Sequence, residues 1–305
     1  MWGLNGCKRR AVVIQQLPLL TNAAFPAFPV AGGLAEPHDV MVRVWNVVAV
    51  VAVAGVALGA SIRLVGRRHL FPAHEVPVVA PPPSVQLWQF QASDGETVRA
   101  LAVSSGGLGR VVVHFHNNRE TMMEPLWLAQ GLAARGVDVV LAEYRGYGLS
   151  RSGGAPTEEG LYRDAEATLD ELARRGFGPE RVVLWGTSLG SGVAAEMARR
   201  HRGAALVLVS PYTSIPDLVR DRASFSLPGV LLPDRFDTAS KAAEIRMPTL
   251  IIHGDADEIV PFSMGERLAT LIAGAVVLRV PDGRHGDLFT RSGDELLDRI
   301  SKLGV

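Results

Sequence analysis

Five residues in the middle of the chain have the pattern of a serine nucleophile. The run Gly186-Thr-Ser-Leu-Gly places Ser188 between two glycines, directly after an apolar run at 181–185 and directly before a stretch with helical spacing. A turn from strand to helix at this point is tight, so its flanking positions must lack bulk and the serine hydroxyl is exposed at the turn. We therefore predict that Ser188 is a nucleophile and that the backbone N–H of Leu189 points at the developing oxyanion.

Two motifs further along the chain supply the acid and the base that such a serine needs. A serine hydroxyl is a poor nucleophile near neutral pH, so a neighbouring base must accept its proton. His285 lies in a glycine-flanked loop after the last apolar run, and Asp257 follows the preceding run. The order serine, acid, histidine is the order found after a G-x-S-x-G turn. We predict Asp257 and His285 as the partners of Ser188, and we expect Asp255 to hydrogen-bond its own turn.

The elements that would position these residues alternate between short apolar runs and stretches with helical spacing. Such alternation predicts an α/β fold with a mostly parallel sheet covered on both faces by helices. In sheets of this kind functional residues collect at the carboxyl ends of the strands, where all three candidates lie. We expect strands at 110–115, 137–142, 181–185, 204–209, 248–253 and 276–280, and helices at 125–135, 157–175, 191–200 and 293–303.

Five motifs follow one another in residues 85–303, and together they resemble a known family. They are Glu143-Tyr-Arg-Gly-Tyr-Gly-Leu-Ser, Pro156-Thr-Glu-Glu-Gly-Leu-Tyr-Arg-Asp-Ala, the Gly186 run, Ser210-Pro-Tyr-Thr-Ser-Ile, and His253-Gly-Asp-Ala-Asp-Glu-Ile-Val-Pro-Phe. The order and content are similar to those of the membrane-anchored α/β-hydrolase-domain serine hydrolases, some of which remove fatty acyl groups from protein cysteines. The resemblance implies an α/β-hydrolase fold with Ser188, Asp257 and His285 as its catalytic triad.

The same resemblance implies where the second oxyanion donor lies. His116-Asn-Asn aligns with the family's His-Gly-Asn, so the backbone N–H of Asn118 is implied as the second donor. The sequence departs from the family here, because Asn117 stands in place of a glycine. Asn tolerates left-handed backbone better than most residues. We expect His116 to be structural and His114 to be a strand residue.

A segment of about thirty residues, 215–247, lies where hydrolases insert a cap. Its length allows only a small cap, which contains Arg220 and Arg222. The apolar part at 225–232 could line an acyl site or pack on the sheet, and we favour packing.

The front of the chain contains a long apolar run. Residues 44–62 carry no charge, and as a helix they would rise about 28 Å, close to the thickness of the hydrocarbon core. We predict a membrane anchor at 41–68, a leader at 1–40, a proline-rich linker at 69–84 and a catalytic domain at 85–305. Two other interpretations are a cleaved signal peptide starting at Met41 and a buried core helix.

The charges flanking this run bear on localisation. Three arginines follow the run and one precedes it, which favours a single-pass membrane protein with its large domain in the cytoplasm. The first 80 residues carry seven Lys or Arg against three Asp or Glu, and the rest of the chain has the opposite balance. This distribution gives no support for a nucleic-acid-binding body. The single cysteine, Cys7, excludes an intrachain disulfide and a Cys-based metal site.

Taken together, the residues predict a membrane-anchored serine hydrolase that cleaves a carboxylic ester or thioester through an acyl-enzyme. We expect a small or lipid-like acyl substrate, or an acylated protein, and no metal or organic cofactor. Two alternatives are a membrane-anchored binding or scaffold protein without turnover and a cofactor-free enzyme of haloperoxidase type. Serine at position 188 excludes an aspartate-nucleophile dehalogenase.

Overall fold

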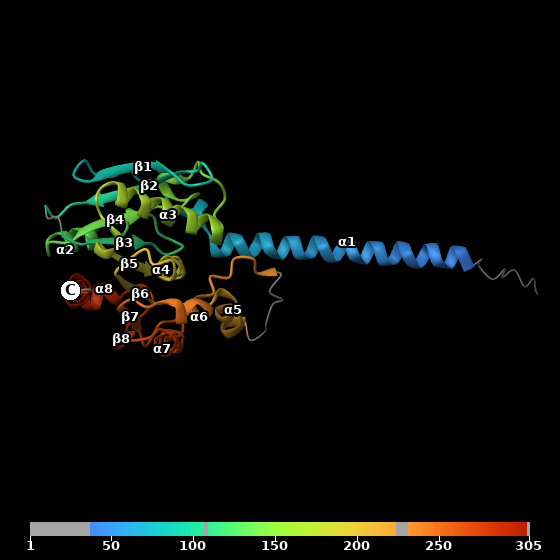
Figure 1. The fold of residues 1–305 in the computed structure, drawn as a ribbon. Helices are drawn as coiled ribbons and strands as arrows, with labels where there is room; N and C mark the ends of the chain where they lie inside the picture. Colours follow the sequence, from blue (N-terminus) through green and yellow to red (C-terminus); the bar gives the residue numbers. More distant parts are fainter. Residues whose placement is uncertain (1–36, 107–108, 224–230, 304–305) are drawn as a thin grey trace, which may run out of the picture. The chain divides into compact units, whose positions relative to one another are not determined.

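The sheet has the predicted α/β character. The computed structural model describes residues 37–106, 109–223 and 231–303, and in this part of the chain eight strands form one sheet in the order β1-β2-β4-β3-β5-β6-β7-β8 (Figure 1). In the part of the sheet from β4 to β8, every pair of neighbouring strands is parallel. The pairs β1–β2 and β2–β4 are antiparallel. The strands are β1 (Gln86–Gln91), β2 (Thr97–Val103), β3 (Val111–Phe115), β4 (Asp138–Ala142), β5 (Val182–Thr187), β6 (Ala205–Val209), β7 (Thr249–Gly254) and β8 (Val276–Val280).

Helices cover both faces of this sheet, which confirms the predicted fold class. One face packs against α3, α4 and α7, and the other packs against α2 and α8. Two short helices, α5 and α6, lie in the predicted cap between β6 and β7, and residues 224–230 of that cap lie outside the described residues. The helices are α2 (Leu126–Ala133), α3 (Glu158–Arg174), α4 (Leu189–Arg199), α5 (Ile215–Ala223), α6 (Thr238–Lys241), α7 (Phe262–Leu271) and α8 (Leu288–Lys302), with short 3₁₀ turns at Ala73–Glu75, Gly148–Ser150, Pro179–Arg181 and Ala242–Glu244.

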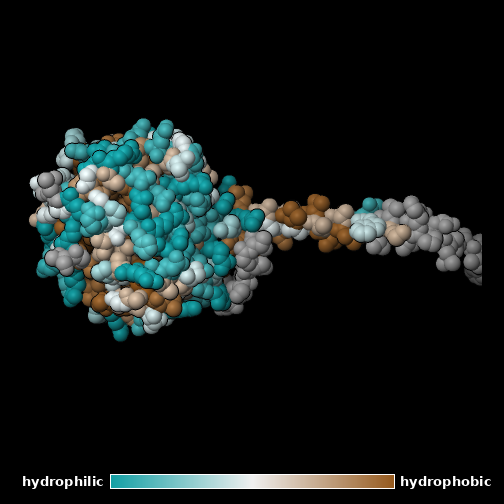
Figure 2. Space-filling view, in the orientation of Figure 1, coloured by the Kyte–Doolittle hydropathy of each residue, from teal (hydrophilic) through white to brown (hydrophobic). Residues whose placement is uncertain are grey.

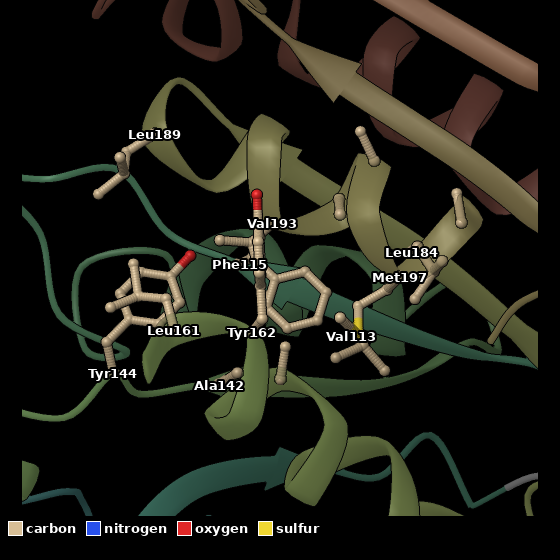
Figure 3. Packing of buried hydrophobic residues seen from close by; sticks show 14 of the residues in the cluster. Val113, Phe115, Ala142, Tyr144, Leu161, Tyr162, Leu184, Leu189, Val193 and Met197 are labelled. Atoms are coloured by element: carbon tan, nitrogen blue, oxygen red, sulfur yellow. The ribbon is translucent and has the colours of Figure 1, made fainter. Parts of the chain in front are cut away.

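The central strands are apolar throughout because both of their faces are covered. In β3, Val111, Val113 and Phe115 face the layer of α3 and α4, whereas Val112 faces the layer of α2 and α8. Figure 3 shows Val113 and Phe115 packed among side chains from neighbouring elements, including Met197 of α4. A strand buried on both faces reads as a continuous apolar run, which is why these strands could be predicted from the sequence.

The hairpin of β1 and β2 and the start of α8 differ from the predicted elements. In β1 buried and exposed residues alternate at the edge of the sheet, so the strand has no continuous apolar run. Helix α8 begins at Leu288 rather than at residue 293, because a second helical segment precedes a kink at Ser292 (φ −134°, ψ 28°). The early start matters for the site, because it places α8 directly after the loop that holds His285.

The apolar run near the front of the chain lies in α1 (Pro37–Leu70). Within it, Trp45–Leu70 has a mean hydropathy of 2.2 and is long and apolar enough to cross a membrane. Apolar side chains dominate this helix in Figure 2. A signal sequence would have the same length and composition, so the anchor stays a prediction. Residues 1–36 of the predicted leader at 1–40 lie outside the described residues, and α1 begins within its last four residues.

The predicted linker at 69–84 begins within the folded domain. Phe71, Ala73 and Val76 are buried in the same core cluster as the strands. Although this region contains five prolines, it is not a spacer along its whole length. Its first part is held in the folded domain by the burial of apolar side chains. The other predicted domain boundaries stay predictions.

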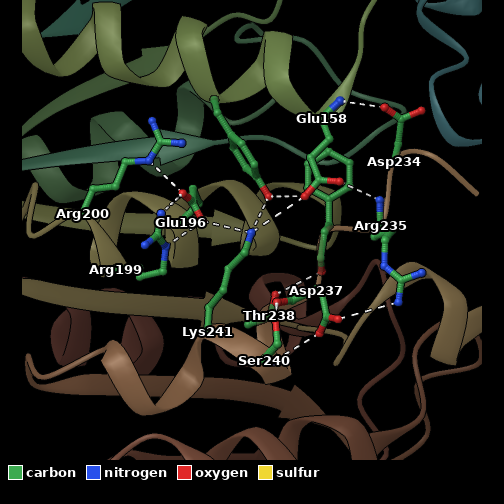
Figure 4. A network of polar contacts seen from close by, with 12 residues as sticks. Glu158, Glu196, Arg199, Arg200, Asp234, Arg235, Asp237, Thr238, Ser240 and Lys241 are labelled. Atoms are coloured by element: carbon green, nitrogen blue, oxygen red, sulfur yellow. Dashed lines mark hydrogen bonds and ion pairs between the residues drawn. The ribbon is translucent and has the colours of Figure 1, made fainter. Parts of the chain in front are cut away.

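A buried carboxylate connects two helices, α4 and α6, beside the central sheet. Glu196 of α4 has a side chain that is 3% exposed and pairs with Arg199, Arg200 and Lys241 of α6 (Figure 4). Burial alone would raise the pKa of Glu196, but the hydrogen bonds from these three cations lower it to about 2. The network therefore holds α6, at the end of the cap, against α4.

We expect this network to make stability depend on pH in acid. A carboxylate with a lowered pKa stabilises the fold above its unfolded pKa of about 4.5, and this contribution disappears as the pH falls towards 2. The melting temperature of the wild type should therefore fall more steeply between pH 4.5 and 2 than that of Glu196→Gln. Thermal unfolding followed by circular dichroism measures this, and equal slopes would contradict the assignment.

Candidate active site

Ser188 lies at the turn between β5 and α4, in a strained backbone conformation. Its φ of 50° and ψ of −115° are unusual for a residue with a side chain, and its N–H is held by the carbonyl of Val209 at 2.9 Å. A Cβ on Gly190 would lie 2.0 Å from the carbonyl oxygen of Phe115, and a Cβ on Gly186 would lie 2.2 Å from that of Gly190. The two glycines are therefore required because backbone passes within contact distance on both sides of the serine.

The predicted partners of Ser188 lie in hydrogen-bonding positions. The Nε2 atom of His285 is 3.0 Å from Ser188 Oγ, and its Nδ1 atom is 2.9 Å from Asp257 Oδ2. With the proton on Nδ1, the imidazole donates to the carboxylate and accepts from the serine hydroxyl. Ser188 follows β5, Asp257 follows β7 and His285 follows β8, so the sheet brings together three residues that are far apart in the chain.

Asp257 is fixed as a carboxylate by its surroundings. Its side chain is fully buried, and burial alone would raise its pKa. Hydrogen bonds from His253 and His285, and from the backbone N–H of Val260, outweigh burial and hold the pKa of Asp257 well below its usual range. The group stays ionised at neutral pH and can stabilise a proton on His285.

The histidine and aspartate next to this pair have structural roles. His253 is buried, and its Nε2 atom lies 3.0 Å from the carbonyl oxygen of Val260. Asp255 pairs with Arg279 and accepts from the N–H of Asp282, so it holds the turn after β7 to the end of β8. We expected Asp255 to hydrogen-bond its own turn, but its side chain instead accepts from Arg279 and Asp282, because the end of β8 lies beside that turn.

The two residues predicted to supply the oxyanion donors line the same cavity as the serine. Asn118, Ser188, Leu189 and His285 all line a cavity of about 310 Å³. Within the described ranges, the backbone N–H groups of Asn118 and Leu189 have no hydrogen-bond acceptor. Both are therefore available to an oxygen bound beside Ser188 Oγ.

Buried side chains rather than glycine hold the loop that carries Asn118. Tyr144 donates to the carbonyl of His116 at 3.1 Å, and Tyr147 donates to the carbonyl of Asn118 at 3.2 Å. His116 Nε2 lies 3.0 Å from Glu143 Oε1, and both side chains are buried. His116 thus has the structural role expected from the sequence.

Asn117 causes no conflict at the position where the family has glycine. Its φ is not positive, so this backbone is accessible to any residue. Its side-chain oxygen accepts from the N–H of Arg119 at 2.8 Å and stabilises the turn. The side chain of Asn118 donates to the carbonyl of Leu70 at 3.0 Å, which connects the loop to the last residue of α1.

Several residues around the site could not be found by sequence reasoning. Glu143, Tyr144 and Tyr147 belong to one of the five motifs, but nothing in their spacing predicts that they turn towards the loop after β3. His69 and Leu70 lie on the cavity wall beside Ser188, although the sequence placed them at the edge of a linker. His114 is a strand residue as expected, and its Nε2 atom lies 3.1 Å from Thr187 Oγ1.

A second cavity of about 260 Å³ also reaches His285. Its polar lining comes from His114, Asn117, Glu120, Glu124 and Thr187, and its apolar lining includes Trp127 and Phe289. Among the residues that the structure describes, no group of three or more His, Cys, Asp or Glu side chains could hold a metal ion.

We expect Gly190→Ala to damage the site severely. The added methyl would meet the backbone of Phe115, which cannot move without shifting β3. Reactivity of Ser188 towards a fluorophosphonate should fall at least about tenfold, or the melting temperature should fall by several degrees. Gly293→Ala is the matched control, because a Cβ there meets nothing within 4 Å. A Gly190→Ala protein with wild-type labelling and stability would contradict the geometry.

The chain is similar to proteins of one large superfamily. The family model described as serine aminopeptidase, S33, matches residues 109–235, which include Ser188. An uncharacterized protein of Mycobacterium tuberculosis (strain H37Rv) is 34% identical over 201 residues, covering 65% of this chain and 71% of the relative. The uncharacterized protein YfhR of Salmonella typhi is 31% identical over 220 residues, covering 66% and 74%.

Solved structures show the same fold. The Pyrococcus furiosus esterase Pf2001 superposes with a TM-score of 0.62 at 16% identity, covering 74% of this chain and 96% of the esterase. Est1E from Butyrivibrio proteoclasticus, solved with ferulic acid bound, gives a TM-score of 0.60 at 17% identity, covering 70% and 96%. From its sequence relatives and its fold, the chain belongs to the α/β-hydrolase superfamily.

Proposed function

We propose that this protein is a serine hydrolase that cleaves a carboxylic ester or thioester through an acyl-enzyme. The observation that carries the proposal is the hydrogen-bonded series from Ser188 Oγ through His285 to Asp257, with distances of 3.0 and 2.9 Å. A scaffold without turnover would need neither the strained serine backbone nor a buried carboxylate aligned with the histidine.

The geometry suggests a specific sequence of proton transfers. His285 Nε2 takes the proton of Ser188 as Oγ attacks the substrate carbonyl carbon, and Asp257 stabilises the imidazolium. The N–H groups of Leu189 and Asn118 donate to the oxyanion, each donor being worth about 10²–10³ in rate. When the tetrahedral intermediate collapses, the bond to the alcohol or thiol breaks and His285 protonates the leaving group. Water then attacks the acyl-enzyme by the same steps and releases the acid.

The cavity beside Ser188 supports an acyl group as the substrate portion bound there. Its apolar lining comes from the end of α1, the loop after β6, the cap and the loop after β7: Leu70, Tyr212, Ile215, Leu218, Ile259 and Val260. An apolar cavity of about 310 Å³ next to two N–H donors suits a short or medium acyl chain with its carbonyl at the donors. Lipid-like esters, acyl thioesters and acylated proteins all present such a group.

Removing the serine hydroxyl should abolish activity. In Ser188→Ala, kcat/KM for p-nitrophenyl esters should fall by at least about 10⁴, and fluorophosphonate labelling should disappear. The matched control is Ser191→Ala, one turn further along α4, where the buried hydroxyl has no hydrogen-bond partner within the described ranges. The control should keep both signals. Equal labelling of the wild type and Ser188→Ala, or no labelling of either, would refute the proposal. Esters and thioesters of increasing chain length then define the preferred acyl group.

We also propose that α1 anchors the enzyme in a membrane, with the large domain in the cytoplasm. The length and hydropathy of Trp45–Leu70 support this, and the basic residues at the end of the helix support the orientation. The protein should stay in the membrane fraction after a wash with alkaline carbonate. The native protein should also still contain residues 44–62 near its N-terminus. A soluble protein whose first residue lies after this run would instead identify the run as a cleaved signal peptide.

A further inference from the structure

The second cavity at His285 is placed to hold the leaving group of the proposed reaction. The cavity with Ser188 also contains both N–H donors, so the carbonyl and its acyl chain belong there. The second cavity has neither Ser188 nor the donors, but it shares His285 with the first. His285 is the residue that would protonate the departing atom, so the leaving group must lie on its accessible side.

The chemistry of this cavity is acidic and aromatic. Glu120 and Glu124 line it, and no Lys or Arg within the described ranges forms an ion pair with either. Glu120 is half-buried, and burial raises its pKa above the usual range. The nearby charge of His116 and hydrogen bonds from Asn117 lower that pKa in part, and a bound cation would further favour the carboxylate form.

Two further observations point to a ligand. Trp127 lines the cavity while 52% exposed, a large aromatic surface that the fold itself does not use. His114 also lines the cavity, is 2% exposed and has no partner for Nδ1 among the described residues. Burial, and next the charge of His116, lowers the pKa of His114 to about 3, so the imidazole is neutral and adds no positive charge to the cavity.

We propose that this cavity binds the leaving group and selects one that carries a positive charge, such as the alcohol of a choline or amino-alcohol ester. Glu120 and Glu124 supply the counter-charge, and the ring of Trp127 provides a face for an ammonium group. Asp257 neutralises the imidazolium that forms on His285, so the triad itself does not repel a cation. The inference rests on the proposed ester hydrolysis and adds the class of leaving group.

The test compares two esters with the same acyl chain. In one the alcohol is choline, and in the other it is 3,3-dimethylbutanol, in which carbon replaces the quaternary nitrogen and only the charge is lost. We expect the wild-type kcat/KM to be at least about tenfold higher for the choline ester. The ratio should fall towards one in Glu120→Gln and Glu124→Gln, and it should fall in part in Trp127→Leu.

Glu266→Gln is the control, because Glu266 is an exposed carboxylate of α7 that lines neither cavity. It should keep the wild-type ratio. As a second measurement, tetramethylammonium ion should slow the fluorophosphonate labelling of wild-type Ser188 and have a weaker effect on Glu120→Gln.

The outcomes separate this inference from the proposed function. In one outcome, Ser188 is labelled and both esters are hydrolysed, but the wild-type ratio of kcat/KM for the choline ester to that for the neutral ester is near or below one. This outcome would overturn the leaving-group assignment alone. An unchanged ratio in both glutamate variants would overturn it as well. A wild type that neither labels nor hydrolyses any ester would overturn the proposed function and this inference together.

Discussion

The close approach of two stretches of backbone at Gly190 fixes the part of the candidate site that contains Ser188 and Asn118. The start of α4 passes so near the carbonyl of Phe115 that no Cβ fits, and this contact joins the end of β5 to the end of β3. Ser188 is held at a positive φ by the same turn, and the loop carrying Asn118 leaves β3 directly beside it. Ser188 and the loop carrying Asn118 are therefore positioned by one contact.

Buried polar side chains complete what that contact begins. The loop after β3 contains Asn117 at the position where the family that this sequence resembles has glycine. The loop is held by the hydroxyl groups of Tyr144 and Tyr147 and by the His116–Glu143 pair. The two hydroxyl groups donate to loop carbonyls and Glu143 Oε1 pairs with His116, so the loop is held at three points. The side chain of Asn117 adds a further contact within the loop by accepting from the N–H of Arg119.

The structure also divides the surroundings of His285 into two chemically different cavities. One is largely apolar and contains the serine, and the other is acidic and aromatic. The end of α1 contributes Leu70 to the apolar side and accepts a hydrogen bond from Asn118. A helix that the sequence marks only as a membrane candidate thus ends at the wall of the active-site cavity.

The sequence by itself determined the fold class and the central strands, and it predicted Ser188, Asp257 and His285, which the sheet brings within hydrogen-bonding distance. These were accessible because they depend on local patterns: continuous apolar runs, a glycine-flanked serine, and polar loops directly after strands. Only the tertiary structure decided how Asn117 fits, that the tyrosines after β4 hold the loop after β3, and that Leu70 lines one cavity at His285 while Glu120 and Trp127 line the other. These contacts are between residues far apart in the chain, and local spacing or periodicity does not predict which distant side chains will line the same cavity.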